Sequence, residues 1–170
     1  MKIKVLTFLY ISLLLGFAVG GSSCSDRRTY DHYESRPITG WERNDTATFR
    51  IPRQWEGDYS LDLGLRTTIK YPYKSICLIL EGKVIPAGKH KDSETFQKEI
   101  VCRVVDDNGL LMGKRGISNS EILNHATNLS LNRGDSLFLT VRHIMSREQL
   151  PGISDVGVRL IKIILLSDKN

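Results

Sequence analysis

The feature that most constrains the fold of this chain is a recurring alternation of apolar and polar side chains with a period of two. It is clearest at residues 59–66, where Tyr59, Leu61, Leu63 and Leu65 fall on one face of an extended segment. Successive side chains of a β-strand point to opposite faces, so this pattern predicts a strand with one buried side. No long helix is predicted after residue 23, and the chain is therefore expected to be all-β.

Seven or eight strands can be placed in this way. Turn signals at Asn108-Gly109, Gly134-Asp135 and Pro151-Gly152 separate them, and the first of these predicts a tight hairpin. Residues 117–125 are less regular, and one helical turn is an alternative there. Short strands with hairpin turns predict an antiparallel β-sandwich with jelly-roll-like connections. The remaining strand candidates are residues 46–51, 76–80, 96–105, 110–114, 129–131, 137–144 and 156–165.

The N-terminus predicts export. Lys2 and Lys4 precede an apolar stretch at residues 5–19, and residues 20–23 supply small side chains. These are the three parts of a secretory signal peptide. The apolar run is shorter than the about 20 residues that a membrane-spanning helix needs, so cleavage is favoured over a retained transmembrane anchor.

Cys24 follows at the position where a bacterial lipoprotein carries its acylated cysteine. The match to a lipobox is imperfect, since Gly21 stands where an aliphatic residue is usual. We predict that residues 1–23 are removed and that Cys24 receives acyl chains such as palmitate, which would hold the protein at a membrane. The alternative is an ordinary signal peptide cut nearby, with a free Cys24.

The mature chain is predicted to be one tethered domain. Removal of the signal leaves 147 of the 170 residues, enough for one core. Residues 24–44 show no sustained period and are predicted as a lipid-anchored tether, with residues 45–170 as the β-sandwich domain. The net charge of +5 falls to +3 without Lys2 and Lys4. Because the basic residues are scattered and the protein is exported, no nucleic-acid partner is predicted.

Two cysteines remain in the predicted domain. Cys77 and Cys102 both lie in apolar, β-branched segments, where a free cysteine behaves as a small buried hydrophobe. Two buried thiols are therefore favoured. A disulfide is the open alternative, because it depends on Cα atoms within about 7 Å of each other, which the sequence does not reveal.

Several short motifs resemble catalytic or binding signatures. Gly134-Asp135-Ser136-Leu137 matches an esterase motif, but the only histidine beyond it, His143, lies on the same candidate strand, where it cannot serve as base. Arg133-Gly134-Asp135 resembles an integrin-binding tripeptide, and a turn explains both motifs. Residues 109–114 lack the spacing of a phosphate loop, and the four histidines show no ligand spacing. No enzyme activity, cofactor or metal is predicted.

Two tripeptides suggest a modification. Asp45-Thr46-Ala47 and Asp135-Ser136-Leu137 are similar to the O-glycosylation acceptor of exported proteins in the Bacteroidota. Thr46 and Ser136 are therefore candidate glycosylation residues. Such tripeptides are common, so the motif alone does not establish the modification.

Four segments together resemble a known family. They are residues 30–33 with Gly40-Trp41, residues 71–73, residues 111–114, and residues 150–159. In order and spacing they are similar to the gliding-motility-associated lipoprotein H family (GldH) of the Bacteroidota, although Met112 stands where that family often has tryptophan. The resemblance implies an outer-membrane lipoprotein that gliding members need for motility and type IX secretion, and it implies no known reaction.

The leading functional hypothesis is therefore a non-enzymatic component of an envelope assembly. Its expected partners are membrane lipid, through acylated Cys24, and other envelope or motility lipoproteins. A surface-anchored carbohydrate-binding module, with a glycan as partner, is the alternative, and a hydrolase ranks last. Aromatic residues near strand ends are usually core. The candidates for one partner-binding edge are Trp41, Tyr71, Tyr73, Leu150, Pro151 and Asp155.

Overall fold

The computed structural model describes residues 28–88 and 92–164. Within these residues there are eleven strands and no helix, and hence no helix long and apolar enough to cross a membrane. The strands are β1 (Arg28–Ser35), β2 (Trp41–Glu42), β3 (Ala47–Ile51), β4 (Gly57–Thr67), β5 (Ser75–Ile85), β6 (Glu94–Arg103), β7 (Lys114–Arg115), β8 (Ser120–Leu131), β9 (Ser136–His143), β10 (Gln149–Leu150) and β11 (Ile153–Lys162).

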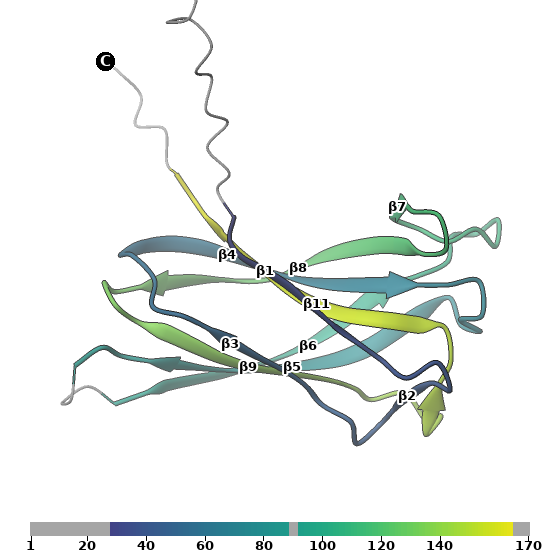
Figure 1. The fold of residues 1–170 in the computed structure, drawn as a ribbon, viewed down its shortest axis with the longest axis horizontal. Helices are drawn as coiled ribbons and strands as arrows, with labels where there is room; N and C mark the ends of the chain where they lie inside the picture. Colours follow the sequence, from purple (N-terminus) through teal and green to yellow (C-terminus); the bar gives the residue numbers. More distant parts are fainter. Residues whose placement is uncertain (1–27, 89–91, 165–170) are drawn as a thin grey trace, which may run out of the picture.

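Antiparallel pairing arranges these strands as two facing sheets (Figure 1). One sheet has the order β1-β11-β4-β8-β7 and the other β3-β9-β5-β6, while β2 and β10 form a separate pair. Most consecutive strands lie in different sheets. This is the strand order of a jelly roll, with β7 added at one edge and the β2–β10 pair at one end. The predicted antiparallel sandwich with jelly-roll-like connections is confirmed.

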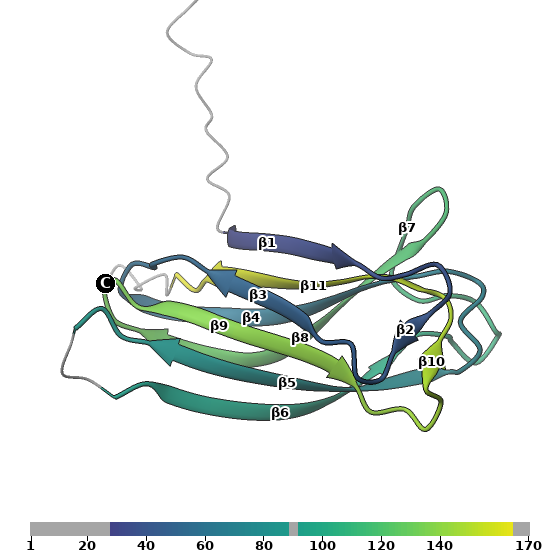
Figure 2. The ribbon, with the colours of Figure 1, turned by 60° about the horizontal axis from the view of Figure 1, so that its bottom comes forward.

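The core lies between the two sheets, which Figure 2 shows as two layers. Tyr59, Leu61, Leu63 and Leu65 of β4, the residues of the clearest alternation, are all fully buried. Each fully buried aliphatic or aromatic side chain contributes about 1.5–3 kcal/mol, so this shared core is the main stabilising term. The second sheet supplies Phe49, Ile51, Ile76, Leu78, Leu80, Leu137, Leu139 and Val141.

The sandwich begins earlier in the chain than predicted. Residues 28–35 form β1, which pairs with β11 along its length. Five of its eight side chains are exposed, so no apolar alternation marks it as a strand. The predicted tether of residues 24–44 is therefore too long, and the predicted domain of residues 45–170 begins too late.

The segment after β6 also departs from the prediction. Residues 110–112 run back antiparallel as predicted, but only for a short distance: Val105 and Leu111 make an isolated antiparallel bridge, and the N–H groups of Asp106 and Met112 donate to the carbonyls of Leu110 and Val104. The Oδ1 atom of Asp106 accepts hydrogen bonds from the backbone N–H groups of Asn108 (2.9 Å) and Leu110 (2.8 Å). This side-chain bonding holds the predicted turn at Asn108-Gly109, and the pairing beyond it is too short to count as a strand.

The helical turn considered for residues 117–125 does not form. Residues 120–131 are a single long strand, β8, which pairs with β4 from Ser120 to Leu131. Its register shifts opposite Leu61 and Asp62, and such a bulge moves the following side chains to the other face. The shift obscures the period of two in this part of the sequence.

Cys77 and Cys102 are free thiols on paired strands. The register of β5 and β6 places Ile76 opposite Cys102 and Cys77 opposite Val101, so the two sulfur atoms point to opposite faces of the sheet. The prediction of two thiols is confirmed, although Cys77 is only half-buried. Burial raises the pKa of the Cys102 thiol to about 11.

The ring of Tyr33 holds β1 against its sheet. It lies over Gly157 of β11 and Gly64 of β4, where any side chain would collide with it: a Cβ at Gly157 would lie 2.5 Å from the ring. The guanidinium carbon of Arg66 stands 4.1 Å from the ring centre. Burial is the main cause of the raised pKa of the Tyr33 hydroxyl. We call this arrangement the two-glycine slot.

We expect Gly157→Ala to destabilise the domain by about 1–3 kcal/mol, the usual cost of overpacking, because the new methyl group displaces the Tyr33 ring. Chemical denaturation measures the loss. Gly88→Ala is the matched control, since a Cβ there meets nothing within 4 Å and should leave stability unchanged or slightly higher. In a double-mutant cycle with Tyr33→Ser, the losses in unfolding free energy from the two substitutions should be non-additive. Strictly additive losses would contradict the packing of Tyr33 in the two-glycine slot.

Candidate functional site

One end of the sandwich gathers the loops that carry the most exposed apolar side chains. Figure 2 shows this end at the right, where β1 finishes and where β2, β7 and β10 lie. We call it the tip and define it as residues 36–40, 68–74, 104–119 and 151–152, all of which the structure describes. These segments connect strands of both sheets, so the tip spans the full thickness of the sandwich.

Three isoleucines project from three different loops of the tip. Ile38 and Ile69 expose 96% and 90% of their surface, and Ile117 is as open as in an extended chain. None of them contributes to the core. A single exposed isoleucine is ordinary, but three at one end of the domain make this end the candidate interaction surface.

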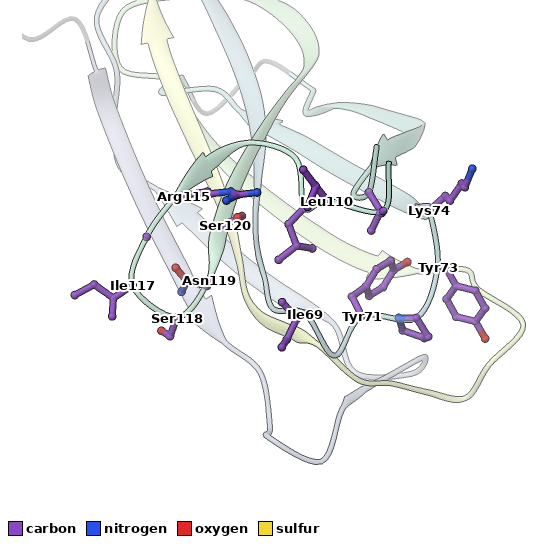
Figure 3. Close-up of a pocket in the computed structure, with 15 residues that line it drawn as sticks. Ile69, Tyr71, Tyr73, Lys74, Leu110, Arg115, Ile117, Ser118, Asn119 and Ser120 are labelled. Carbon is purple, nitrogen blue, oxygen red and sulfur yellow. The ribbon is translucent and has the colours of Figure 1, made fainter. Parts of the chain in front are cut away.

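An apolar cleft lies between two of these isoleucines. Its volume is about 460 Å³, and it opens between the loop of residues 68–74 and the loop that follows β7. Figure 3 shows Ile69, Tyr71 and Leu110 around its centre, while Ile117 projects outward from the rim. The rings of Tyr71 and Tyr73 meet edge-to-face, with centres 5.9 Å apart. We call this the tip cleft.

A second groove continues from the tip cleft toward β1. It has a volume of about 310 Å³ and is lined by Ile38, Ile69 and Ile153, among others. Ile69 and Ser118 line both hollows. The two hollows therefore adjoin at these two residues, and apolar side chains contribute to both.

The comparisons with known proteins agree with the sequence resemblance. Residues 28–160 match the GldH lipoprotein family, which is most of the chain. The chain belongs to this family. A curated relative named "Gliding motility lipoprotein GldH homolog", from Christiangramia forsetii, is 27% identical over 165 residues, covering 91% of this chain and 94% of the relative. Membership of a lipoprotein family implies lipid anchoring and association with the cell envelope.

Solved structures are similar at a lower level. The Eiger TNF of S. frugiperda is 12% identical, with a TM-score of 0.33, over 85% of this chain and 98% of that one. The VP2 subviral particle of infectious bursal disease virus is 17% identical, with a TM-score of 0.35, over 79% of this chain and 31% of that one.

In this GldH family member, two of the predicted edge residues belong to the core. Trp41 of β2 pairs with Leu150 of β10, and both side chains are fully buried. The Trp41 indole N–H donates to the carbonyl of Asp45 at 2.8 Å, and the His143 ring meets the indole edge-to-face. We call this arrangement the clasp. Neither Trp41 nor Leu150 can contact a partner through its side chain, so their prediction as binding residues is wrong.

The other predicted edge residues do not form one surface. Tyr71 is 95% buried and donates from its hydroxyl to the carbonyl of Ser75. Asp155 lies on β11, where its carboxylate accepts a hydrogen bond from the Ser35 hydroxyl at 2.8 Å. Pro151 is half-buried at the turn before β11. Of the six residues, Tyr73 remains as a partly exposed side chain at the tip cleft.

The sequence reasoning missed the exposed isoleucines. Each is a lone aliphatic residue inside a polar or turn-forming loop, as in Pro37-Ile38-Thr39 and Gly116-Ile117-Ser118. Such a residue belongs to no strand pattern and is too short a signal for an interaction motif. Position in a loop does not separate such a residue from a core side chain, since the loop residue Tyr71 is buried.

A serine, a histidine and a carboxylate do meet on the outer face of the first sheet. The Ser60 hydroxyl lies 3.0 Å from Nδ1 of His125, and Asp62 Oδ1 lies 3.4 Å from the same nitrogen. A catalytic triad needs the serine and the carboxylate on opposite ring nitrogens. Ser60 also donates to Asp62 at 3.0 Å, and Arg159 holds that carboxylate at 2.8 Å. This is a surface polar network without the geometry of a nucleophile and its base.

The two remaining sequence motifs have structural explanations. Asp135 is buried, and its Oδ2 accepts the backbone N–H of Asn132 at 2.9 Å, so the Gly-Asp turn is confirmed. Ser136, the first residue of β9, is half-buried, and Thr46 is exposed just before β3. O-glycosylation at these hydroxyls stays a prediction.

The clasp predicts a pH dependence. His143 is fully buried and its Nε2–H donates to the carbonyl of Trp41 at 3.0 Å. Burial, with Arg43 nearby, lowers the pKa of His143. The unfolded chain, with a histidine pKa of about 6.5, therefore takes up a proton first as the pH falls. Stability should be complete above that value and decline below it.

Denaturation midpoints between pH 7.5 and 5 measure this decline. His143→Gln should flatten the pH dependence, whatever it does to stability at pH 7.5. His125→Gln, which changes a histidine side chain that is 54% exposed, should leave the dependence in place. If the denaturation midpoint of the His143 variant fell with pH as steeply as that of the wild type, the clasp would not be the source of the pH dependence.

Proposed function

We propose that this protein is a lipid-anchored outer-membrane component of a gliding motility and type IX secretion apparatus, and that it acts by binding another envelope protein at its tip. It catalyses no reaction. The observation that carries the proposal is the group of three exposed isoleucines around two adjoining hollows. A monomer gains nothing from such exposure, whereas a partner that covers it gains the free energy of apolar burial.

The position of the tip supports this assignment. Lipidation at Cys24 would place the membrane four residues before Arg28, a span of at most about 14 Å. Arg28 is the end of β1 remote from the tip, part-way along the sandwich in Figure 2, and the eight residues of β1 cover roughly 23 Å. The anchor would therefore attach to the chain at a distance from the tip.

Protein binding ranks above the carbohydrate alternative for a geometric reason. A sugar-binding face uses aromatic rings that lie in one plane beside polar groups. Here the Tyr71 and Tyr73 rings are inclined at 74°, and Tyr71 is buried. The exposed indole of Trp55 belongs to the β3–β4 connection at the other end, with Arg133 stacked on it at 4.9 Å.

We expect Ile69→Ser and Ile117→Ser to abolish partner contact without loss of stability, because both side chains are outside the core. A photo-crosslinking residue at position 73 should capture one discrete envelope protein in living cells, identified by mass spectrometry, and either serine variant should eliminate that adduct. Ile164→Ser, at an exposed isoleucine beyond β11, is the control and should leave it. The absence of any adduct, or an adduct that persists in both serine variants, would refute binding at this surface.

We expect Cys24→Ser to leave a folded protein that is no longer retained in the membrane fraction, since the acyl chains supply the attachment. Intact-mass measurement of the mature wild-type chain should find an acylated N-terminal Cys24. Cys77→Ser removes a different free thiol and should keep the lipid. An unmodified mature N-terminus at another residue would rule out this anchor.

A further inference from the structure

The charge distribution around the tip cleft indicates what kind of segment it binds. The tip loops contain five basic residues and two acidic ones. Lys74 and Arg115 line the cleft from opposite sides, as Figure 3 shows, and Lys70 lines the adjoining groove. The apolar surface is therefore bordered by cations contributed by two separate loops.

The two acidic residues of the tip pair with only one of the bordering cations, Lys74. Asp106 uses its Oδ1 atom to hold its own turn. Asp107 is shared by Arg103 at 2.5 Å and Lys74 at 3.7 Å, and hydrogen bonding to Arg103 is the main cause of its lowered pKa. Within the part of the chain that the structure describes, Lys70 and Arg115 make no ion pair.

We infer that the tip cleft receives an apolar side chain from an acidic segment of the partner, whose carboxylates meet Lys70, Lys74 and Arg115. This inference rests on the proposed function and specifies the chemistry of its partner. The cleft is concave and lined by Ile69, Tyr71, Tyr73 and Leu110, which suits an inserted aromatic or branched aliphatic group. Flanking carboxylates would find cations on both sides of that group.

A protein segment suits this site better than an anionic membrane. Lipid headgroups could also meet the cations, and the isoleucines could enter a bilayer. A bilayer surface, however, offers no single protruding side chain to occupy a cleft of about 460 Å³. The tip also lies at the end of β1 remote from the predicted lipid attachment.

Electrostatic complementarity of this kind acts mainly on the rate and selectivity of association. The cations are exposed, so their effect should be screened by salt, with a Debye length of about 8 Å at 0.15 M ionic strength. Apolar insertion into the cleft should be much less sensitive to salt. The two contributions can therefore be separated experimentally.

The test uses the mature chain carrying Cys24→Ser and four matched groups of short fluorescent peptides. The first group has one Phe or Leu between acidic residues, the second has it between basic residues, and the third has it between Ser and Asn. The fourth group contains acidic residues alone. Fluorescence anisotropy measures binding at 0.05 and 0.5 M NaCl. Acidic peptides with an apolar centre should bind best, about tenfold more tightly than the Ser/Asn group at low salt, and should lose that advantage at high salt.

Charge-reversed variants provide the decisive comparison. Lys70→Glu and Arg115→Glu should each weaken binding of the acidic apolar peptides severalfold and improve binding of the basic ones. Lys83→Glu, an exposed lysine of β5 outside the tip, should change neither. Ile69→Ser should weaken every peptide with an apolar centre, at both salt concentrations.

Three results would overturn the inference. They are equal affinity for acidic and basic peptides, no binding of any peptide group, and binding to phosphatidylglycerol vesicles that depends on Ile69 in the absence of peptide binding. Loss of the cellular crosslink in Ile69→Ser, with no effect of Lys70→Glu or Arg115→Glu on that crosslink, would leave the proposed function standing and remove only the acidic partner.

Discussion

The position of β1 depends on the seating of Tyr33 in the two-glycine slot, and this contact joins the beginning of the described chain to its end. β1 has few buried side chains, so its position rests on the β11 ladder and on this one ring. Gly64 and Gly157 contribute by lacking side chains, and Arg66 covers the ring from the solvent side. Once β1 is seated, Arg28 lies at the end of β1 remote from the tip, and the loop of residues 36–40 enters the tip. The distance between the proposed lipid attachment and the proposed binding surface is thus set by a local packing contact.

The C-terminal end of β1 is held by a second interaction, made by the guanidinium of Arg36. Its side chain is only 7% exposed and bonds Glu34 at 2.7 Å and Asp45 at 2.9 Å. Glu34 in turn accepts the backbone N–H of Thr48 at 3.2 Å, so the network links the first sheet to β3 of the second. A buried cation is tolerated only when its partners compensate it, which makes this geometry demanding. The clasp lies beside this network, and together they hold the chain where the tip loops begin. The loops therefore start from fixed positions and can keep their isoleucines exposed.

The contrast between what the sequence revealed and what it concealed has a physical basis. Strands with one buried face, such as residues 59–66, were predictable because burial imposes a period of two on their side chains. β1 was not, since an edge strand held by backbone bonds and glycines leaves no apolar period. Trp41 and Tyr71 were predicted as binding residues because aromatic side chains suit both cores and interfaces, and only three-dimensional packing separates the two uses. The isoleucines of the tip escaped notice because exposure is a property of the assembled loops and has no signature in a single residue.

The segments that carry the family resemblance act mostly in the scaffold. Residues 30–33 form β1 and fill the two-glycine slot, Trp41 and Leu150 form the clasp, and residues 153–159 supply the β11 ladder on which β1 rests. Residues 71–73 and Leu111 also line the tip cleft, and Gly152 and Ile153 line the adjoining groove. Ile38, Ile69 and Ile117 lie in none of these segments. Family membership therefore accounts for the jelly roll. Under the proposed function, the exposed isoleucines that would meet the partner lie in loops between the family segments, where a side chain can change without disturbing either sheet.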